Sequence, residues 1–191
     1  MVTDWPPEDK RRLAEYWESD RLGSLELPAD ERLRAPAAAM EAALESDQSA
    51  RVRDACVEFV TAAADFYRVP RPEVRVLAAR PLRVREGGWS TELFGDYEHG
   101  KRRIRVWMRT AIRRKVTSYG TFLSTLCHEF CHHLDYERFR FGDSYHTRGF
   151  YERTAVLYHH ARATPVKQLF WRALPGDRWR IDWARTKKGS A

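Results

Sequence analysis

The five residues His128-Glu129-Phe130-Cys131-His132 constrain this chain more than any other stretch of it. In a helix, positions i and i+4 lie one turn apart on the same face, so both imidazoles can bind one metal ion. The glutamate between them then reaches a water molecule held by that ion. The spacing therefore predicts His128 and His132 as metal ligands, zinc being the usual ion, and Glu129 as a general base.

The residues around this pattern support a helix. Apolar side chains recur at helical spacing and form a single stripe, and the two histidines fall roughly opposite it. Such a helix can pack with one side and bind a metal with the other. The alternative is a buried helix with two ordinary histidines. The stripe consists of Leu123, Leu126, Cys127, Phe130 and Leu134.

A catalytic zinc needs a third protein ligand and keeps its fourth position open. His146 is the leading candidate, because the short loop 140–145 can turn the chain back over the motif helix. Thr147 can then cap a second helix. Glu152, which lies 20 residues after His132, is the rival candidate and would suit a zinc peptidase with two histidines and one glutamate as ligands.

The HExxH pattern, a loop and then His146-Thr147-Arg148-Gly149-Phe150 resemble the SprT-like metalloprotease domain, which also occurs in the Spartan proteases. The resemblance covers roughly residues 50–163. It implies a zincin-like fold, His128, His132 and His146 as zinc ligands, Glu129 as general base, and substrates that are proteins crosslinked to DNA. The chain departs from the family in two ways. It has no CxxC pairs for a C-terminal zinc ribbon, and its motif helix ends in the polar run 132–135, HHLD.

Composition and periodicity predict an α+β fold in which a small, mostly antiparallel sheet packs on helices that include the motif helix. We expect a helical N-terminal extension over 1–46 with no visible chemistry, a zincin-like domain over 47–163, and a basic tail with tryptophans over 164–191. Order is expected to weaken from Thr164, and residues 186–191 are expected to be disordered. Residues 91–98 and 101–108 are expected to form a hairpin around His99-Gly100, which is the candidate edge for binding extended substrate.

Charge is unevenly distributed along the chain, whose formal net charge is +7. Residues 71–120 carry 13 basic and 5 acidic side chains, whereas residues 1–50 carry 6 basic and 12 acidic ones. The basic segment could follow the phosphates of DNA, face the acidic N-terminal segment, or simply be solvated.

The three cysteines, Cys56, Cys127 and Cys131, are too few and too unevenly placed for a disulfide framework. We expect them to be reduced core residues, and a ligand role for Cys131 is disfavoured because it points away from the histidine pair. The N-terminus lacks the order of a secretory signal, and no stretch has the length of a membrane span. The expected location is therefore the cytoplasm, without a membrane partner.

Three functional hypotheses follow. The first is a zinc endopeptidase that cleaves proteins or peptides, with DNA-associated proteins as one substrate class. The second is a zincin peptidase without a nucleic-acid link, with Glu152 in place of His146. The third is a non-catalytic zinc-binding module, although a purely structural site has no need of Glu129. Tyr145, Tyr151 and His133 are the candidate donors to a developing oxyanion.

Overall fold

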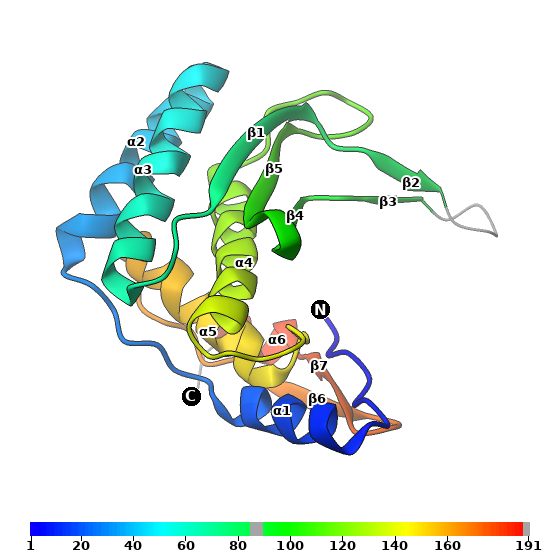
Figure 1. Ribbon diagram of the computed structural model, residues 1–191. Coiled ribbons are helices and arrows are strands. Elements are labelled where there is room, and N and C mark those ends of the chain that lie inside the picture. Colours follow the sequence, from blue (N-terminus) through cyan, green and yellow to red (C-terminus); the bar gives the residue numbers. More distant parts are fainter. Residues whose placement is uncertain (85–89, 189–191) are drawn as a thin grey trace.

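A computed structural model describes residues 1–84 and 90–188, and Figure 1 shows their arrangement. The central sheet has three strands in the order β1-β5-β4. Strand β5 (Arg103–Arg109) lies in the middle, parallel to β1 (Glu73–Ala79) and antiparallel to β4 (Gly95–Glu98). Strand β4 is therefore an edge strand, and its outer backbone groups have no partner within this sheet.

The motif helix α4 (Tyr119–Glu137) packs under β4 and β5, so the sheet edge and the HExxH residues are neighbours. Helix α5 (Arg148–Ala161) packs on α4, and α1 (Lys10–Arg21) packs on α5. Helices α2 (Asp30–Glu45) and α3 (Ser49–Tyr67) pack side by side (Figure 1), α3 also packs on β1, and α2 contacts α4 and α5.

Burial of the amphipathic faces creates one core between these layers. The apolar stripe expected on α4 is buried in full. The core also takes side chains from α2, α3, β5 and α5, including Leu33, Met40, Phe59, Ile104 and Phe150. Each fully buried side chain of this size contributes about 1.5–3 kcal/mol of transfer free energy, and this burial fixes where α4 presents its polar face.

Two small hairpins lie outside the central sheet. Strands β2 (Leu82–Val84) and β3 (Ser90–Glu92) form a ribbon that projects from the body in Figure 1. Strands β6 (Trp171–Leu174) and β7 (Arg178–Ile181) form the second hairpin, which is followed by α6 (Trp183–Lys188). Near the N-terminus, Val2 forms an antiparallel bridge with Arg180 and so lies beside β7.

The expected α+β class is confirmed, and several local expectations are corrected. The hairpin around His99-Gly100 exists, with the short helix η1 (His99–Lys101) at its turn, but it is shorter than predicted because Thr91 and Glu92 pair with β2 instead. The parallel β1–β5 pair was not predicted and makes the central sheet mixed. The tail is ordered through Lys188, whereas 189–191 lie outside the described residues.

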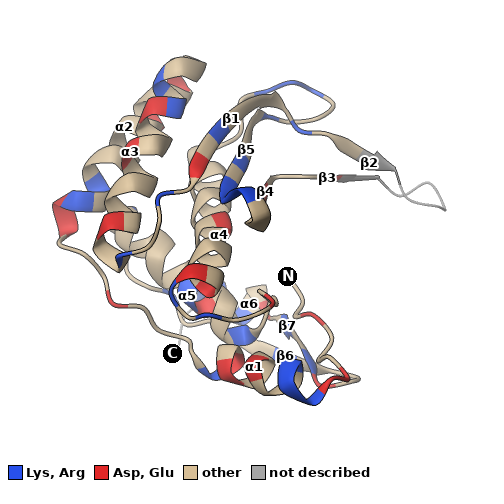
Figure 2. Cartoon of the chain, in the orientation of Figure 1, with Lys and Arg blue, Asp and Glu red and all other residues tan. Residues whose placement is uncertain are grey.

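Figure 2 marks where Lys, Arg, Asp and Glu lie along the chain. Most of the described basic residues of the segment 71–120 form ion pairs with acids. Arg103 contacts Glu73 and Glu98, and Arg105 contacts Asp96. Arg109 contacts Asp47, which belongs to the acidic N-terminal segment. Within 1–84 and 90–188, no helix combines the length and apolar character that crossing a bilayer requires. The three cysteines are buried and free, as expected.

Candidate metal centre

Three local features bring His146 to the face of α4 that carries His128 and His132. The helix ends after Glu137, and Arg140 adopts a left-handed backbone conformation with φ of 62°, which reverses the chain. Thr147 then caps α5 by accepting a hydrogen bond from the Phe150 N–H at 3.1 Å. His146 directly precedes this cap, so the start of α5 fixes its position.

The Nε2 atoms of the three histidines converge. His128 Nε2 lies 3.2 Å from His132 Nε2 and 3.0 Å from His146 Nε2. Two nitrogens bound to one tetrahedral zinc ion at about 2.0–2.1 Å lie about 3.3 Å apart. In the described part of the chain, these three histidines form the one cluster whose ligand atoms lie within 4.8 Å of one another. They could therefore hold a metal ion.

The hydrogen bonds on the Nδ1 side of His132 orient its Nε2 atom toward the point where the three Nε2 atoms converge. Ser144 Oγ donates to Asp135 Oδ2 at 2.7 Å and lies 2.7 Å from His132 Nδ1. Because Ser144 donates its hydroxyl proton to Asp135, its oxygen can only accept from His132, so His132 must carry a proton on Nδ1. The lone pair of His132 is then on Nε2, where a metal would bind.

A second support lies behind His146 and comes from the N-terminus. Asp4 Oδ2 lies 3.1 Å from His146 Nδ1 and accepts a hydrogen bond from the His146 backbone N–H at 2.9 Å. Burial acts to raise the pKa of Asp4, but the contacts with His146 outweigh it and lower that pKa. An ionised carboxylate only accepts hydrogen bonds, so His146 also carries its proton on Nδ1 and presents Nε2 to the cluster.

Electrostatics favour neutral imidazoles on α4. Burial, assisted by the neighbouring His146, lowers the pKa of His128 to about 3. Burial also lowers the pKa of His132 well below its ordinary value, with further contributions from His128 and His146. A metal ion binds the neutral form of histidine, so both side chains are ready to act as ligands at neutral pH.

Glu129 lies against the edge strand. Its side chain is 5% exposed, and burial, with a smaller effect from Asp96, raises its pKa to about 8. Gly95 of β4 makes this approach possible, because a Cβ atom at that position would lie 2.8 Å from Glu129 Oε1. The absence of a side chain at residue 95 therefore lets β4 sit directly over the carboxylate.

His128 and Glu129 open into a cleft of about 650 Å³. Residues 92–95, which run from the end of β3 into the edge strand β4, form one wall, and the first half of α4 forms the floor. Helix α5 and the C-terminal segment form the opposite wall, with Tyr151, Leu169 and Trp183 among the lining residues. Phe94 and Trp183 are exposed large apolar side chains among the lining residues, so part of the cleft surface is apolar.

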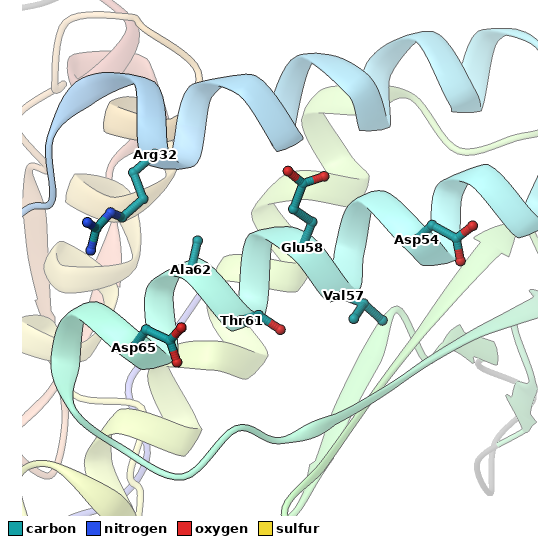
Figure 3. A pocket seen from close by; sticks show the side chains of 7 residues that line it. All are labelled: Arg32, Asp54, Val57, Glu58, Thr61, Ala62 and Asp65. Atoms are coloured by element: carbon teal, nitrogen blue, oxygen red, sulfur yellow. The ribbon is translucent and has the colours of Figure 1, made fainter.

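A second hollow of about 570 Å³ lies on the far side of the molecule, along α3. Its lining is mostly α3 side chains together with Arg32 of α2, as Figure 3 shows. Asp54, Glu58 and Asp65 point from α3, and Asp65 is paired with Arg71. It contains none of the site residues predicted from the sequence.

The structure separates the rival site residues from the cluster. Glu152 accepts a hydrogen bond from Trp171 Nε1 at 3.1 Å and does not join the three histidines. Among the candidate oxyanion donors, His133 is fully buried and bonded to Tyr97 and the Pro70 carbonyl, and Tyr145 contacts Asp143. Of these candidate donors, Tyr151 is the one that lines the cleft, with its ring stacked 5.7 Å from that of His146.

Asp4 and Ser144 were missed by the sequence analysis. Ser144 lies in the loop that was expected to reverse the chain, two residues before His146, which could have marked it. Asp4 gave no such signal, because it belongs to a segment expected to carry no chemistry and contacts a residue 142 positions away. Comparison with known proteins adds no assignment, since no protein-family model, no curated protein and no solved structure matches the chain.

Proposed function

We propose that this chain is a zinc-dependent peptidase in which His128, His132 and His146 bind the ion and Glu129 acts as general base. One observation carries the proposal. Three imidazoles with Nε2 directed to one point stand beside a buried glutamate, and this glutamate and His128 line an open cleft. Three histidine ligands with a free fourth position are a donor set typical of catalytic zinc.

When bound there, zinc would supply a positive charge that polarises a peptide carbonyl and lowers the pKa of a water molecule. Glu129 accepts a proton from the attacking water and delivers it to the leaving amine. The raised pKa of about 8 suits this exchange, because a group that alternates between base and acid works best near the ambient pH.

The edge strand β4 supplies a place for substrate. An extended peptide can add to the unpaired edge through main-chain hydrogen bonds, which places a peptide bond near Glu129. Across the cleft, the Tyr151 hydroxyl donates to the Val2 carbonyl at 3.2 Å. Turning this donor to the cleft would let it stabilise the oxyanion that develops on the scissile carbonyl.

Substitution of Glu129 by glutamine tests the proposal. The variant keeps the shape of the side chain and removes the base, so we expect retained zinc and proteolysis of an unfolded protein lowered by several orders of magnitude. Glu152→Gln is the matched control, because this glutamate is the rival ligand and is bonded to Trp171. It should keep both zinc and activity.

The outcomes separate the three hypotheses. Full activity of Glu129→Gln would refute the mechanism, and loss of zinc in Glu152→Gln with retention in His146→Ala would favour the second class of peptidase. Zinc bound stoichiometrically by a wild-type chain that cleaves nothing would leave a non-catalytic zinc-binding module. Elemental analysis and a proteolysis assay on the same preparations measure these quantities.

The resemblance to SprT-like domains suggests substrates near DNA, and this part of the proposal depends on few residues. Arg113, Arg114 and Lys115 are exposed, and no ion pair is found for them in the described residues. If they recruit DNA, added DNA should raise cleavage of an unfolded substrate, and salt should reverse the effect. Cleavage that DNA does not change would leave the peptidase proposal standing and contradict the proposed link to DNA.

A further inference from the structure

Residue Asp4 makes an unusually complete set of contacts with one candidate ligand. Its carboxylate accepts from the His146 backbone N–H at 2.9 Å and contacts the ring at Nδ1, 3.1 Å away. Its own backbone N–H donates to the His146 carbonyl at 3.0 Å. Together the three contacts fix both the main chain and the ring of His146.

Asp4 is itself held by segments that are remote in sequence. Its carbonyl accepts a hydrogen bond from the Tyr16 hydroxyl at 3.0 Å. The preceding Thr3 is 2% exposed, donates its backbone N–H to the Trp179 carbonyl and accepts from the Trp179 N–H at 2.8 Å. Residues 1–4 thus run beside β7, and we call this pairing the terminal clasp.

We propose that Asp4 is a positioning residue for the metal centre, and that the terminal clasp holds it against His146. The carboxylate keeps the proton of His146 on Nδ1 and the Nε2 lone pair directed at the ion, and it makes the ligand a stronger donor. The proposal rests on the metal site proposed above, but it does not require peptidase activity.

A purely structural role fits the contacts less well. The Asp4 side chain is 45% exposed, and an exposed ionic contact contributes only about 0–1 kcal/mol to folding. Two buried side chains anchor the segment. Thr3 binds the backbone of Trp179, and the Tyr16 hydroxyl binds the backbone carbonyl of Asp4. The carboxylate of Asp4 therefore has His146 as its main partner.

The test measures metal affinity, with activity left aside. Purified wild-type protein, Asp4→Asn and Asp4→Ala would be titrated with Zn²⁺ against a chromophoric chelator, and their Co²⁺ complexes compared by visible absorption. Loss of such a supporting contact weakens metal binding by about 10–100-fold. We expect that loss in Asp4→Ala, a smaller one in Asp4→Asn, whose amide oxygen still accepts, and a changed Co²⁺ spectrum in both.

Two further variants complete the design. Asp9→Asn is the matched control, because Asp9 caps α1 from an exposed position and asparagine caps equally well. It should bind zinc like the wild type. Thr3→Val loosens the clasp without touching His146, and it should weaken zinc binding by a smaller factor than Asp4→Ala.

The outcomes distinguish this inference from the proposed function. Wild-type affinity and an unchanged Co²⁺ spectrum in Asp4→Ala would overturn the inference while leaving the metal site intact. A wild-type chain that binds no metal would overturn both. Metal-free Asp4→Asn should unfold at the wild-type temperature, and if it instead unfolds far lower while its folded fraction binds zinc normally, the role is structural and the inference is wrong.

Discussion

Two supports hold the candidate ligand imidazoles in this molecule, and they differ in almost every physical respect. The inner support lies behind His132 and runs through Ser144 and Asp135 to Arg153. Asp135 and Arg153 have no exposed surface. The outer support is the single carboxylate of Asp4 behind His146, with a side chain 45% exposed. The inner support must therefore serve the fold as well as the proposed metal site, whereas the outer one can serve that site alone.

Burial explains the difference. Arg153 donates to Asp135 at 2.8 Å and also to the carbonyls of Ser19 and Leu22, which ties α1 to α5 and α4. Charges removed from water are costly unless all their partners are present. Asp4 lies at the surface, where water can replace a lost partner at little cost.

The largest expected effect breaks the inner support. Arg153→Met leaves Asp135 buried without its partner, and breaking a buried pair in this way costs about 3–5 kcal/mol. Denaturant unfolding of the metal-free proteins measures the difference. The matched control is Arg12→Met, because Arg12 pairs with Asp143 at 2.7 Å in an exposed position. It should change stability by less than about 1 kcal/mol, and equal losses in the two variants would contradict the comparison.

The second effect uses pH to probe the buried side of the site. Below pH 6.5, unfolded His128 and His132 bind protons that the folded chain excludes, because burial lowers both pKa values. These two histidines therefore lower the free energy of unfolding as the pH falls below 6.5. Glu129 acts with the opposite sign, because burial raises its pKa to about 8. It is protonated when folded and ionised when unfolded between pH 4.5 and 8, so its contribution falls as the pH rises.

Between pH 6.5 and 8, Glu129 is the one of these three groups that stays protonated in the folded chain and ionised in the unfolded chain. Metal-free protein should lose about 1.4 kcal/mol of stability per pH unit from this group across that window. Glu129→Gln, which carries no titrating proton, should lack this decline. Unfolding in urea with a chelator present, at several pH values, measures both slopes. Parallel slopes for the two proteins would show that Glu129 is not protonated in the folded state.

The part of the site that could be predicted from the sequence is the part that is local. His128, Glu129 and His132 share one helical turn, so spacing alone placed them together, and Thr147 marked the start of α5 by its capping chemistry. The α+β class followed from periodicity. Glu152 could not be excluded from the sequence, because its distance from Trp171 depends on how the tail folds.

The remainder depends on contacts between distant segments. The parallel β1–β5 pair joins strands that are separated by η1, β4 and the β2–β3 ribbon, and no local pattern specifies such a partner. Asp4 reaches His146 only because Val2 and Thr3 pair with β7. A single aspartate near the N-terminus carries no sign of this, whereas the histidines of a helical motif carry their geometry in their spacing.

The smallest effect gives the sharpest comparison of the two supports. Ser144→Ala removes the link between His132 and Asp135 and should cost about 1 kcal/mol of stability in the metal-free protein. Asp4→Asn should cost much less, with an unfolding temperature close to that of the wild type. Because the supports share no residue and act on different histidines, the two losses should add to within about 0.5 kcal/mol in the double variant.

Zinc changes this expectation, since one ion then joins both histidines and each support acts on the same bond network. Repeating the four unfolding measurements with zinc should therefore give a larger interaction energy than without it. Equal interaction energies in the two conditions would mean that His132 and His146 do not share a metal ion.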